Sequence, residues 1–109
     1  MKKSTISIEI ELDENNVPET IQWEASELGK KAECKAMILS VWDKAEANTM
    51  RIDLWTKEMQ VEEMTFFVHQ TLLTLSDSFE KATGDTRMAA TMRDFCDYYA
   101  EKMKISPPL

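Results

Sequence analysis

Glycine is nearly absent from this chain of 109 residues, which contains only 2. Phosphate-binding loops need several closely spaced glycines, because the backbone must approach the phosphate groups closely. Gly29 and Gly84 are far apart in the sequence. A glycine-rich loop for a dinucleotide or a nucleoside triphosphate is therefore excluded.

Cysteine and histidine are also scarce, with 2 and 1 residues. Cys34 and Cys96 lack the close spacing of a zinc site. A disulfide between them is conceivable, but for a cytoplasmic chain we favour two reduced thiols. The sequence predicts no metal ion and no cofactor.

Basic residues are outnumbered, because 13 Lys and Arg stand against 20 Asp and Glu, for a formal net charge of -7. Nucleic acids and anionic membrane surfaces are recognised by clustered positive charge. The only adjacent basic pairs are Lys2-Lys3 and Lys30-Lys31. We therefore expect no nucleic-acid ligand, and the acidity suits a basic protein partner.

Long apolar runs are missing as well. A membrane-spanning helix needs roughly 18 or more consecutive apolar residues, and no window approaches that length. After Lys2-Lys3 the chain alternates apolar residues with Ser and Glu, unlike the continuous apolar segment of an export signal. We expect a cytoplasmic protein without direct membrane insertion.

The N-terminal half contains strand patterns. Apolar and polar residues alternate in TISIEIEL (5–12) and TIQWEA (20–25), which predicts a hairpin of 4–12 with 19–25. The polar segment 26–33 is predicted to be a loop. Residues 34–43 and 49–56 predict a second hairpin.

The C-terminal half contains helix patterns. Apolar residues recur every three or four positions after residue 59, with Glu62 and Glu63 in the first turn. Gly84 is predicted to end the first helix and Asp85 to cap the second. Arg93 and Asp97 have the spacing of an ion pair within that helix. Residues 106–109, SPPL, are expected to be a frayed tail.

Four strands followed by two helices indicate an α+β fold. We predict a single domain over 1–109, with a four-stranded antiparallel sheet of two hairpins over 3–56. The helical pair, 59–104, is expected to pack on one face of that sheet. The predicted core face comprises Met37, Leu39, Val41, Met50, Ile52 and Leu54, and continues into Ile6, Ile8, Ile10, Ile21 and Trp23.

The second hairpin provides the candidate partner-binding site. With a loop at 45–48, Trp42 should face Arg51, Ser40 should face Asp53, and Ile38 should face Trp55. Arg51 could then lie over the Trp42 ring, and Asp53 could reach Ser40 or Arg51.

Apolar patches that contain Trp and Arg are typical of protein–protein interfaces. The candidate residues are Ile38, Trp42, Arg51, Asp53 and Trp55. Alternatively, loop 26–33 or the C-terminal tail covers this patch, and both interpretations stay open here.

Catalytic groups are hard to assemble from this sequence. His69, the only histidine, lies at the edge of the first helix's apolar stripe, and the nearest serines, Ser76 and Ser78, are two turns away. The pair Glu62-Glu63 is typical of a solvated helix surface. We expect no enzymatic activity.

Four segments resemble the gliding-motility protein C family, GldC: LDENNVPETIQW (12–23), ECKAMILSVWD (33–43), NTMRIDLWTKEM (48–59) and MRDFCDYYAEKM (92–103). The resemblance runs from about Ile6 to Ile105 and rests on whole segments rather than a catalytic signature. Gln60 departs from the pattern, because a proline would suit this position at the start of the helix.

The resemblance implies a small accessory protein of the gliding machinery and its linked secretion system, with no catalytic residues to carry over. We expect it to act through protein–protein interaction in the cytoplasm. A secretion-chaperone-like protein that binds clients of that system is the alternative. An enzyme or ligand-binding protein using His69 or Asp53 is a third hypothesis, and a homodimer is left open.

Overall fold

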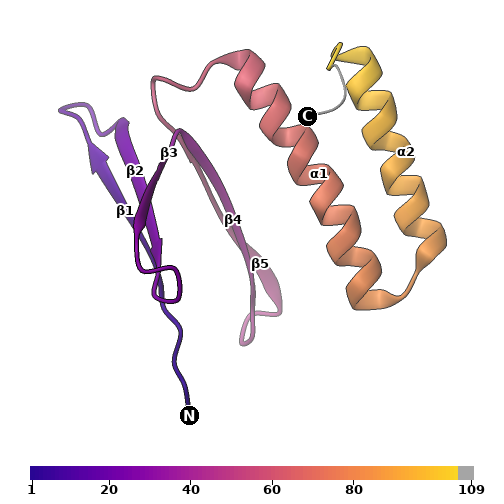
Figure 1. Cartoon of the computed structure of the whole chain (residues 1–109), viewed down its shortest axis with the longest axis horizontal. Helices are drawn as coiled ribbons and strands as arrows, with labels where there is room; N and C mark the ends of the chain where they lie inside the picture. The colour runs from indigo at the N-terminus through magenta and orange to yellow at the C-terminus, as the bar shows by residue number, and fades with distance from the viewer. Residues whose placement is uncertain (106–109) are drawn as a thin grey trace. The chain divides into compact units, whose positions relative to one another are not determined.

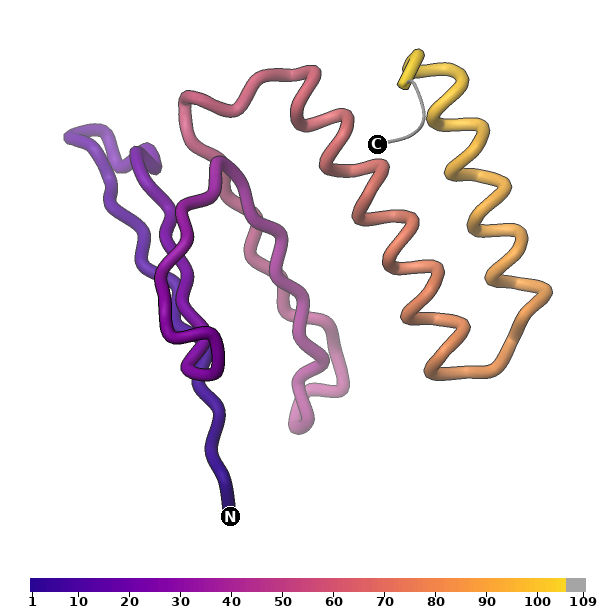
Figure 2. Tube along the Cα trace, viewed as in Figure 1, coloured from indigo at the N-terminus to yellow at the C-terminus, as the bar shows by residue number. Residues whose placement is uncertain are grey.

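The computed structural model describes residues 1–105. The chain divides into two compact units, Met1–Gln60 and Val61–Leu109. The first unit contains all the described strands (Figures 1 and 2). The second contains both described helices, α1 (Val61–Thr83) and α2 (Thr86–Lys102). We predicted that the helices pack on one face of the sheet. That packing depends on how the two units are placed relative to each other, so it stays a prediction.

The first predicted hairpin is confirmed. Strand β1 (Ile6–Leu12) pairs antiparallel with β2 (Pro18–Ala25), so that Ile8 faces Trp23 and Ile10 faces Ile21. The ladder is irregular between Glu11 and Leu12. The alternation of apolar and polar residues thus places the apolar side chains of both strands on one face.

The polar segment 26–33 is not entirely a loop, as we predicted it to be. Residues Lys31–Cys34 form β3, which pairs antiparallel with β2. In this register Ile21 faces Cys34 and Trp23 faces Ala32. On the other face Lys31 lies 3.6 Å from Glu9 of β1, so opposite charges connect the two outer strands. The first sheet therefore has the strand order β1-β2-β3.

The prediction of one four-stranded sheet is wrong, because the strands form two sheets of three and two strands. Strand β4 (Ala36–Asp43) pairs only with β5 (Asn48–Trp55) within the described part of the chain. The edge of β2 that the second hairpin would have used is occupied by β3. A bend at Lys35 separates β3 from β4, and the Lys35 carbonyl accepts a 2.8 Å hydrogen bond from the Thr56 backbone N–H.

The register of the second hairpin differs by two residues from the predicted one. Trp42 faces Thr49, not Arg51, and Ile38 faces Asp53, not Trp55. The loop begins one residue earlier than predicted because Asp43 bonds to residues within it. The Asp43 side chain accepts a 2.7 Å hydrogen bond from the Glu46 N–H, and the Asp43 carbonyl accepts a 3.0 Å bond from the Ala47 N–H. A shift of two preserves the faces, since side chains alternate with a period of two.

The predicted core is buried only in part. Ile21 is fully buried in the first sheet, whereas Val41, Met50 and Ile52 of the second are each slightly more than half exposed. Ile21 lies in the central strand, with Ile10 of β1 on one side and Cys34 of β3 on the other. A two-stranded ribbon has no such flanking strand within the described residues.

Helix α1 (Val61–Thr83) and helix α2 (Thr86–Lys102) form an antiparallel pair (Figure 1). Gly84 has a φ of 73°, and its N–H bonds to the Glu80 carbonyl at 2.8 Å. This is the geometry expected of a glycine that ends a helix in the left-handed conformation. The Asp85 side chain accepts a 2.9 Å hydrogen bond from the Met88 N–H. The predicted ends of both helices at this turn are confirmed.

Small side chains form the seam between the helices. Ser76, Ala89 and Cys96 are almost completely buried. The Ser76 hydroxyl donates to the Leu72 carbonyl at 2.9 Å within its own helix, so it needs no partner on α2. Small residues at these positions allow the two helices to approach closely.

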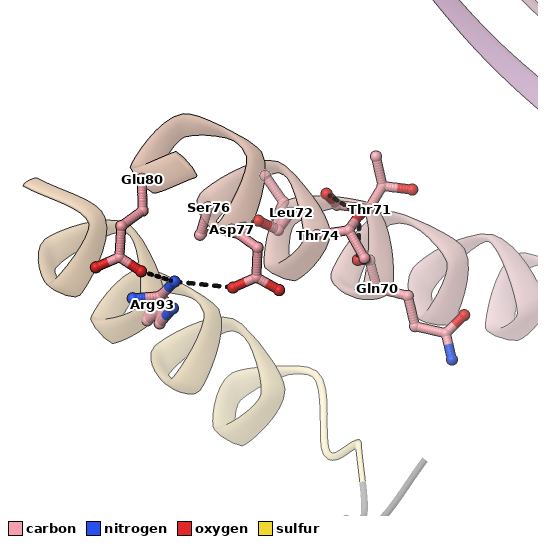
Figure 3. A network of polar contacts seen from close by, with 8 residues as sticks. All are labelled: Gln70, Thr71, Leu72, Thr74, Ser76, Asp77, Glu80 and Arg93. Atoms are coloured by element: carbon pink, nitrogen blue, oxygen red, sulfur yellow. Dashed lines mark hydrogen bonds and ion pairs between the residues drawn. The ribbon is translucent and has the colours of Figure 1, made fainter. Parts of the chain in front are cut away.

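Polar contacts join the helices toward both ends of the seam. Arg93 bonds to Asp77 at 2.8 Å and to Glu80 at 2.9 Å, both on α1 (Figure 3). We expected Arg93 to pair along its own helix with Asp97, but these bonds reach across the pair. Near the other end the Tyr99 hydroxyl donates to the Thr65 carbonyl at 3.0 Å.

The chain turns sharply after α2. Lys104 has a φ of 58°, and its N–H bonds to the Glu101 carbonyl, while the Ile105 N–H bonds to the Ala100 carbonyl. This bond pattern is a Schellman motif, which usually brings the following apolar side chain back onto the helix. Ile105 is buried as that motif predicts. The tail expected at 106–109 lies outside the described residues.

Candidate interaction surface

The five candidate residues lie on one face of the β4–β5 ribbon. Residues that pair directly across strands point to the same side of a sheet. The pairs on this face are Ala36 with Trp55, Ile38 with Asp53, Ser40 with Arg51, and Trp42 with Thr49. We refer to this set of side chains as the tryptophan face.

The apolar members of the tryptophan face are exposed. Trp42 is 70% exposed, Trp55 55% and Ile38 42%. The two tryptophans are six residues apart along the ribbon, because Trp55 pairs with Ala36. At ~3.3 Å per residue this separation is about 20 Å. The face therefore carries one large aromatic ring at each end.

The charged members lie between the tryptophans. The Arg51 guanidinium is 3.5 Å from the Asp53 carboxylate, and both side chains are largely exposed. Exposed ion pairs contribute little to stability, so this pair is not a structural requirement of the hairpin. The predicted contact of Asp53 with Arg51 is thus present. Because Arg51 faces Ser40, its relation to Trp42 is diagonal rather than direct.

Segment 26–33, one of the two proposed covers of the tryptophan face, is partly paired with β2 in the first sheet. Within segment 26–33, residues from Lys31 onward pair with β2 in the first sheet. Ser26 is also held, because its N–H donates to the Thr5 carbonyl at 2.9 Å. The other proposed cover, the C-terminal tail, lies outside the described residues.

His69 is buried in the helical unit rather than placed beside a nucleophile. Its Nε2–H donates to the Cys96 carbonyl at 3.1 Å, and its ring stacks on Tyr99 with 5.7 Å between centroids. The buried Ser76 hydroxyl is engaged with its own helix. The ring also lines an apolar groove between α1 and α2, and sequence reasoning missed this groove. The remaining ring nitrogen, Nδ1, has no hydrogen-bond partner among residues 1–105.

The two cysteines differ in exposure. Both are free, with Cys96 buried and Cys34 half-buried. Burial, with a contribution from Glu33, raises the pKa of the Cys34 thiol and so disfavours the reactive thiolate. Cys34 lines a polar cavity of about 370 Å³ together with Thr56. Among residues 1–105 no three His, Cys, Asp or Glu side chains are arranged to hold a metal ion.

Within residues 1–105, no helix is both long enough and apolar enough to cross a membrane.

Comparison with known proteins identifies a family for this chain. No curated protein and no solved structure matches the chain. A family model described as "GldC-like: Gliding motility-associated protein GldC-like" matches residues 18–105. That range includes β2 to β5 and both helices, and leaves out β1. It confirms the resemblance seen in the sequence, and the chain belongs to the GldC-like family of gliding motility-associated proteins.

Proposed function

We propose that this protein is a non-enzymatic accessory component of gliding motility that binds a protein partner in the cytoplasm through its tryptophan face. The observation that supports the proposal is the exposure of Trp42 and Trp55 at the two ends of one ribbon face. Isolated apolar side chains are common on surfaces, but paired tryptophans with an arginine between them are typical of binding hot spots.

The composition of the face supports a protein rather than a small ligand. Ile38, Trp42 and Trp55 share this face with Ser40, Arg51 and Asp53, and the three apolar side chains are exposed. Protein interfaces combine aromatic anchors with polar groups in this way. The net charge of -7 favours a partner of opposite charge, because complementary fields accelerate encounter.

The test is partner capture by crosslinking in the native cell, with Trp42→Ala combined with Trp55→Ala. One hot-spot tryptophan contributes ~2 kcal/mol or more, which is about 30-fold in affinity, so we expect the double variant to bind the captured partner at least that much more weakly. Tyr98→Ala is the matched control, because Tyr98 is a similarly exposed aromatic residue on α2. Unchanged capture by the folded double variant would remove the proposal.

A chaperone-like role is the second candidate. The observation in its favour is that the β4–β5 ribbon exposes apolar side chains on both faces, with Val41 and Ile52 opposite the tryptophan face. Both outer edges of the ribbon are also unpaired within the described residues, and such edges can bind an extended client strand. The test is whether the protein keeps an unfolded secreted client soluble, and absence of protection at equimolar ratio would reject this role.

A second copy of the chain could instead occupy the tryptophan face. A solution mass measurement distinguishes this from partner binding. If Trp42→Ala with Trp55→Ala converts a dimer into a monomer, the face serves self-association.

A further inference from the structure

The helical unit contains a second candidate site, formed by α1, α2 and Ile105 after α2. A groove of about 510 Å³ is lined by His69, Gln70 and Leu73 from α1, by Asp97, Ala100 and Glu101 from α2, and by Ile105. Ligand-binding pockets commonly have volumes of about 300–1,000 Å³. The groove is therefore large enough for a side chain with its flanking backbone.

The base of the groove is mostly apolar. His69 and Ile105 are buried, and Leu73 and Ala100 are half-buried. The Schellman turn at Lys104 folds Ile105 back to close one end. The spacings 69, 70, 73 and 97, 100, 101 put each set on one side of its helix.

The rim of the groove is acidic. Asp97 and Glu101 are exposed and one helical turn apart, and the third exposed lining residue is the neutral Gln70. The last turn of a helix also carries a partial negative charge from its carbonyl groups, and Glu101 lies in that turn of α2. The neighbouring cation Lys102 is positioned over the Tyr98 ring, 5.7 Å from its centroid.

His69 adds a hydrogen-bond acceptor to this environment. Nε2 must carry the proton, because it bonds to the Cys96 carbonyl. That leaves Nδ1 buried without a hydrogen-bond partner among residues 1–105. An unsatisfied buried acceptor is unfavourable, and His69 lines the groove, so N–H groups of an occupant are favourable near this residue.

We propose that this groove binds an arginine side chain presented by a partner polypeptide, with its methylene stem on the apolar base and its guanidinium at the Asp97/Glu101 rim. The proposal deepens the proposed function, since it rests on the protein acting through a partner. It assigns that partner a second, chemically defined contact that is separate from the tryptophan face. Arginine fits better than lysine, because the guanidinium offers five donors to paired carboxylates.

The test is an amide-resolved NMR titration of the full chain with a capped pentapeptide that has a central arginine between two leucines. The comparison peptide carries citrulline, which has nearly the same shape without the charge. We expect shift changes concentrated at the groove residues, and we expect the citrulline peptide to bind about fivefold more weakly than the arginine peptide. Equal binding of the two peptides, or shift changes centred elsewhere, would overturn the proposal.

Two double variants with the same net charge separate the effect of the rim carboxylates on peptide binding from the effect of the overall charge. Asp97→Asn with Glu101→Gln should weaken arginine-peptide binding about fivefold. Asp94→Asn with Glu62→Gln changes the net charge equally at exposed positions outside the groove and should leave binding unchanged. An equal loss in both double variants, or no loss in the first, would contradict the assignment.

Self-association is tested in the same spectra. Changes at the groove amides on dilution of the protein alone would mean that a second copy occupies the groove, which overturns the proposal. Failure of the peptide titration leaves the Trp42/Trp55 capture result intact. If Trp42→Ala with Trp55→Ala loses partner capture but still binds the arginine peptide, the tryptophan face is a separate site. The failure of one proposal can therefore be told apart from the failure of the other.

Discussion

The Lys57 ammonium group lies 2.6 Å from the Asp13 carboxylate, joining the turn after β1 to the segment after β5. The same carboxylate accepts the backbone N–H groups of Asn15 and Val17, at 2.8 Å and 3.0 Å. The Asp13 side chain is only 12% exposed. This one residue therefore organises the β1–β2 turn and connects it to a residue 44 positions away in the chain.

We predict that the protein loses stability in acid as Asp13 becomes protonated. The hydrogen bond from Lys57, followed by that from Val17, lowers the pKa of Asp13 from 3.8 to about 2. A carboxyl whose folded-state pKa is depressed stabilises the fold above its unfolded pKa. That stabilisation is present above pH 3.8 and is lost as the pH falls toward about 2.

The measurement is denaturant unfolding of the protein and of Asp13→Asn at several pH values. Asp13→Asn should be less stable at pH 7, and the difference should narrow between pH 4 and pH 2. Glu14→Gln, at the exposed neighbouring position, is the control and should show no such convergence. A constant difference across this pH range would contradict the assignment.

The start of α2 provides a second prediction. Asp85 accepts the Met88 N–H at 2.9 Å, and removal of an N-cap acceptor costs about 1 kcal/mol. Asp85→Ala should therefore lower the free energy of unfolding by about that amount, whereas Asp85→Ser should retain most of it. Thermal and urea unfolding measure both. An equal loss in the two variants would show that the capping bond is not the cause.

The helix seam provides a third prediction. Ala89 is fully buried, whereas the next residue, Ala90, is exposed. A leucine at 89 must push the helices apart, and overpacking of this kind costs about 1–3 kcal/mol. Ala89→Leu should therefore be clearly destabilised in urea unfolding, while Ala90→Leu should be nearly neutral. Similar stability of both would mean that the seam is less tightly packed than the structure indicates.

Local signals made much of this fold predictable from the sequence. The alternation in β1 and β2 and the Gly84-Asp85 pair each depend on neighbouring residues, and both were read correctly. The faces of Trp42 and Trp55 were also predicted correctly, even though the register was off by two, because side-chain direction depends only on an even or odd shift.

Features that depend on distant contacts were missed. Strand β3 has only four residues, two of them charged, and it is a strand because β2 offers it an edge. That pairing occupies the second edge of β2, so the β4–β5 hairpin cannot join the sheet there. The His69 groove depends on how α1 and α2 are rotated about their axes, and apolar periodicity fixes that rotation only approximately.

The end of α2 provides the last prediction, which concerns backbone strain. Lys104 adopts a φ of 58°, in the left-handed region where a side chain costs about 1–2 kcal/mol. Glycine removes that cost but loses about 0.5–1 kcal/mol of backbone entropy, so Lys104→Gly should raise the free energy of unfolding by about 0.5–1 kcal/mol. Lys102→Gly, within the helix, should lower it by about 0.5–1 kcal/mol. Urea unfolding of the two variants should therefore shift in opposite directions, and a destabilised Lys104→Gly would show that the lysine side chain contributes more than its strained backbone costs.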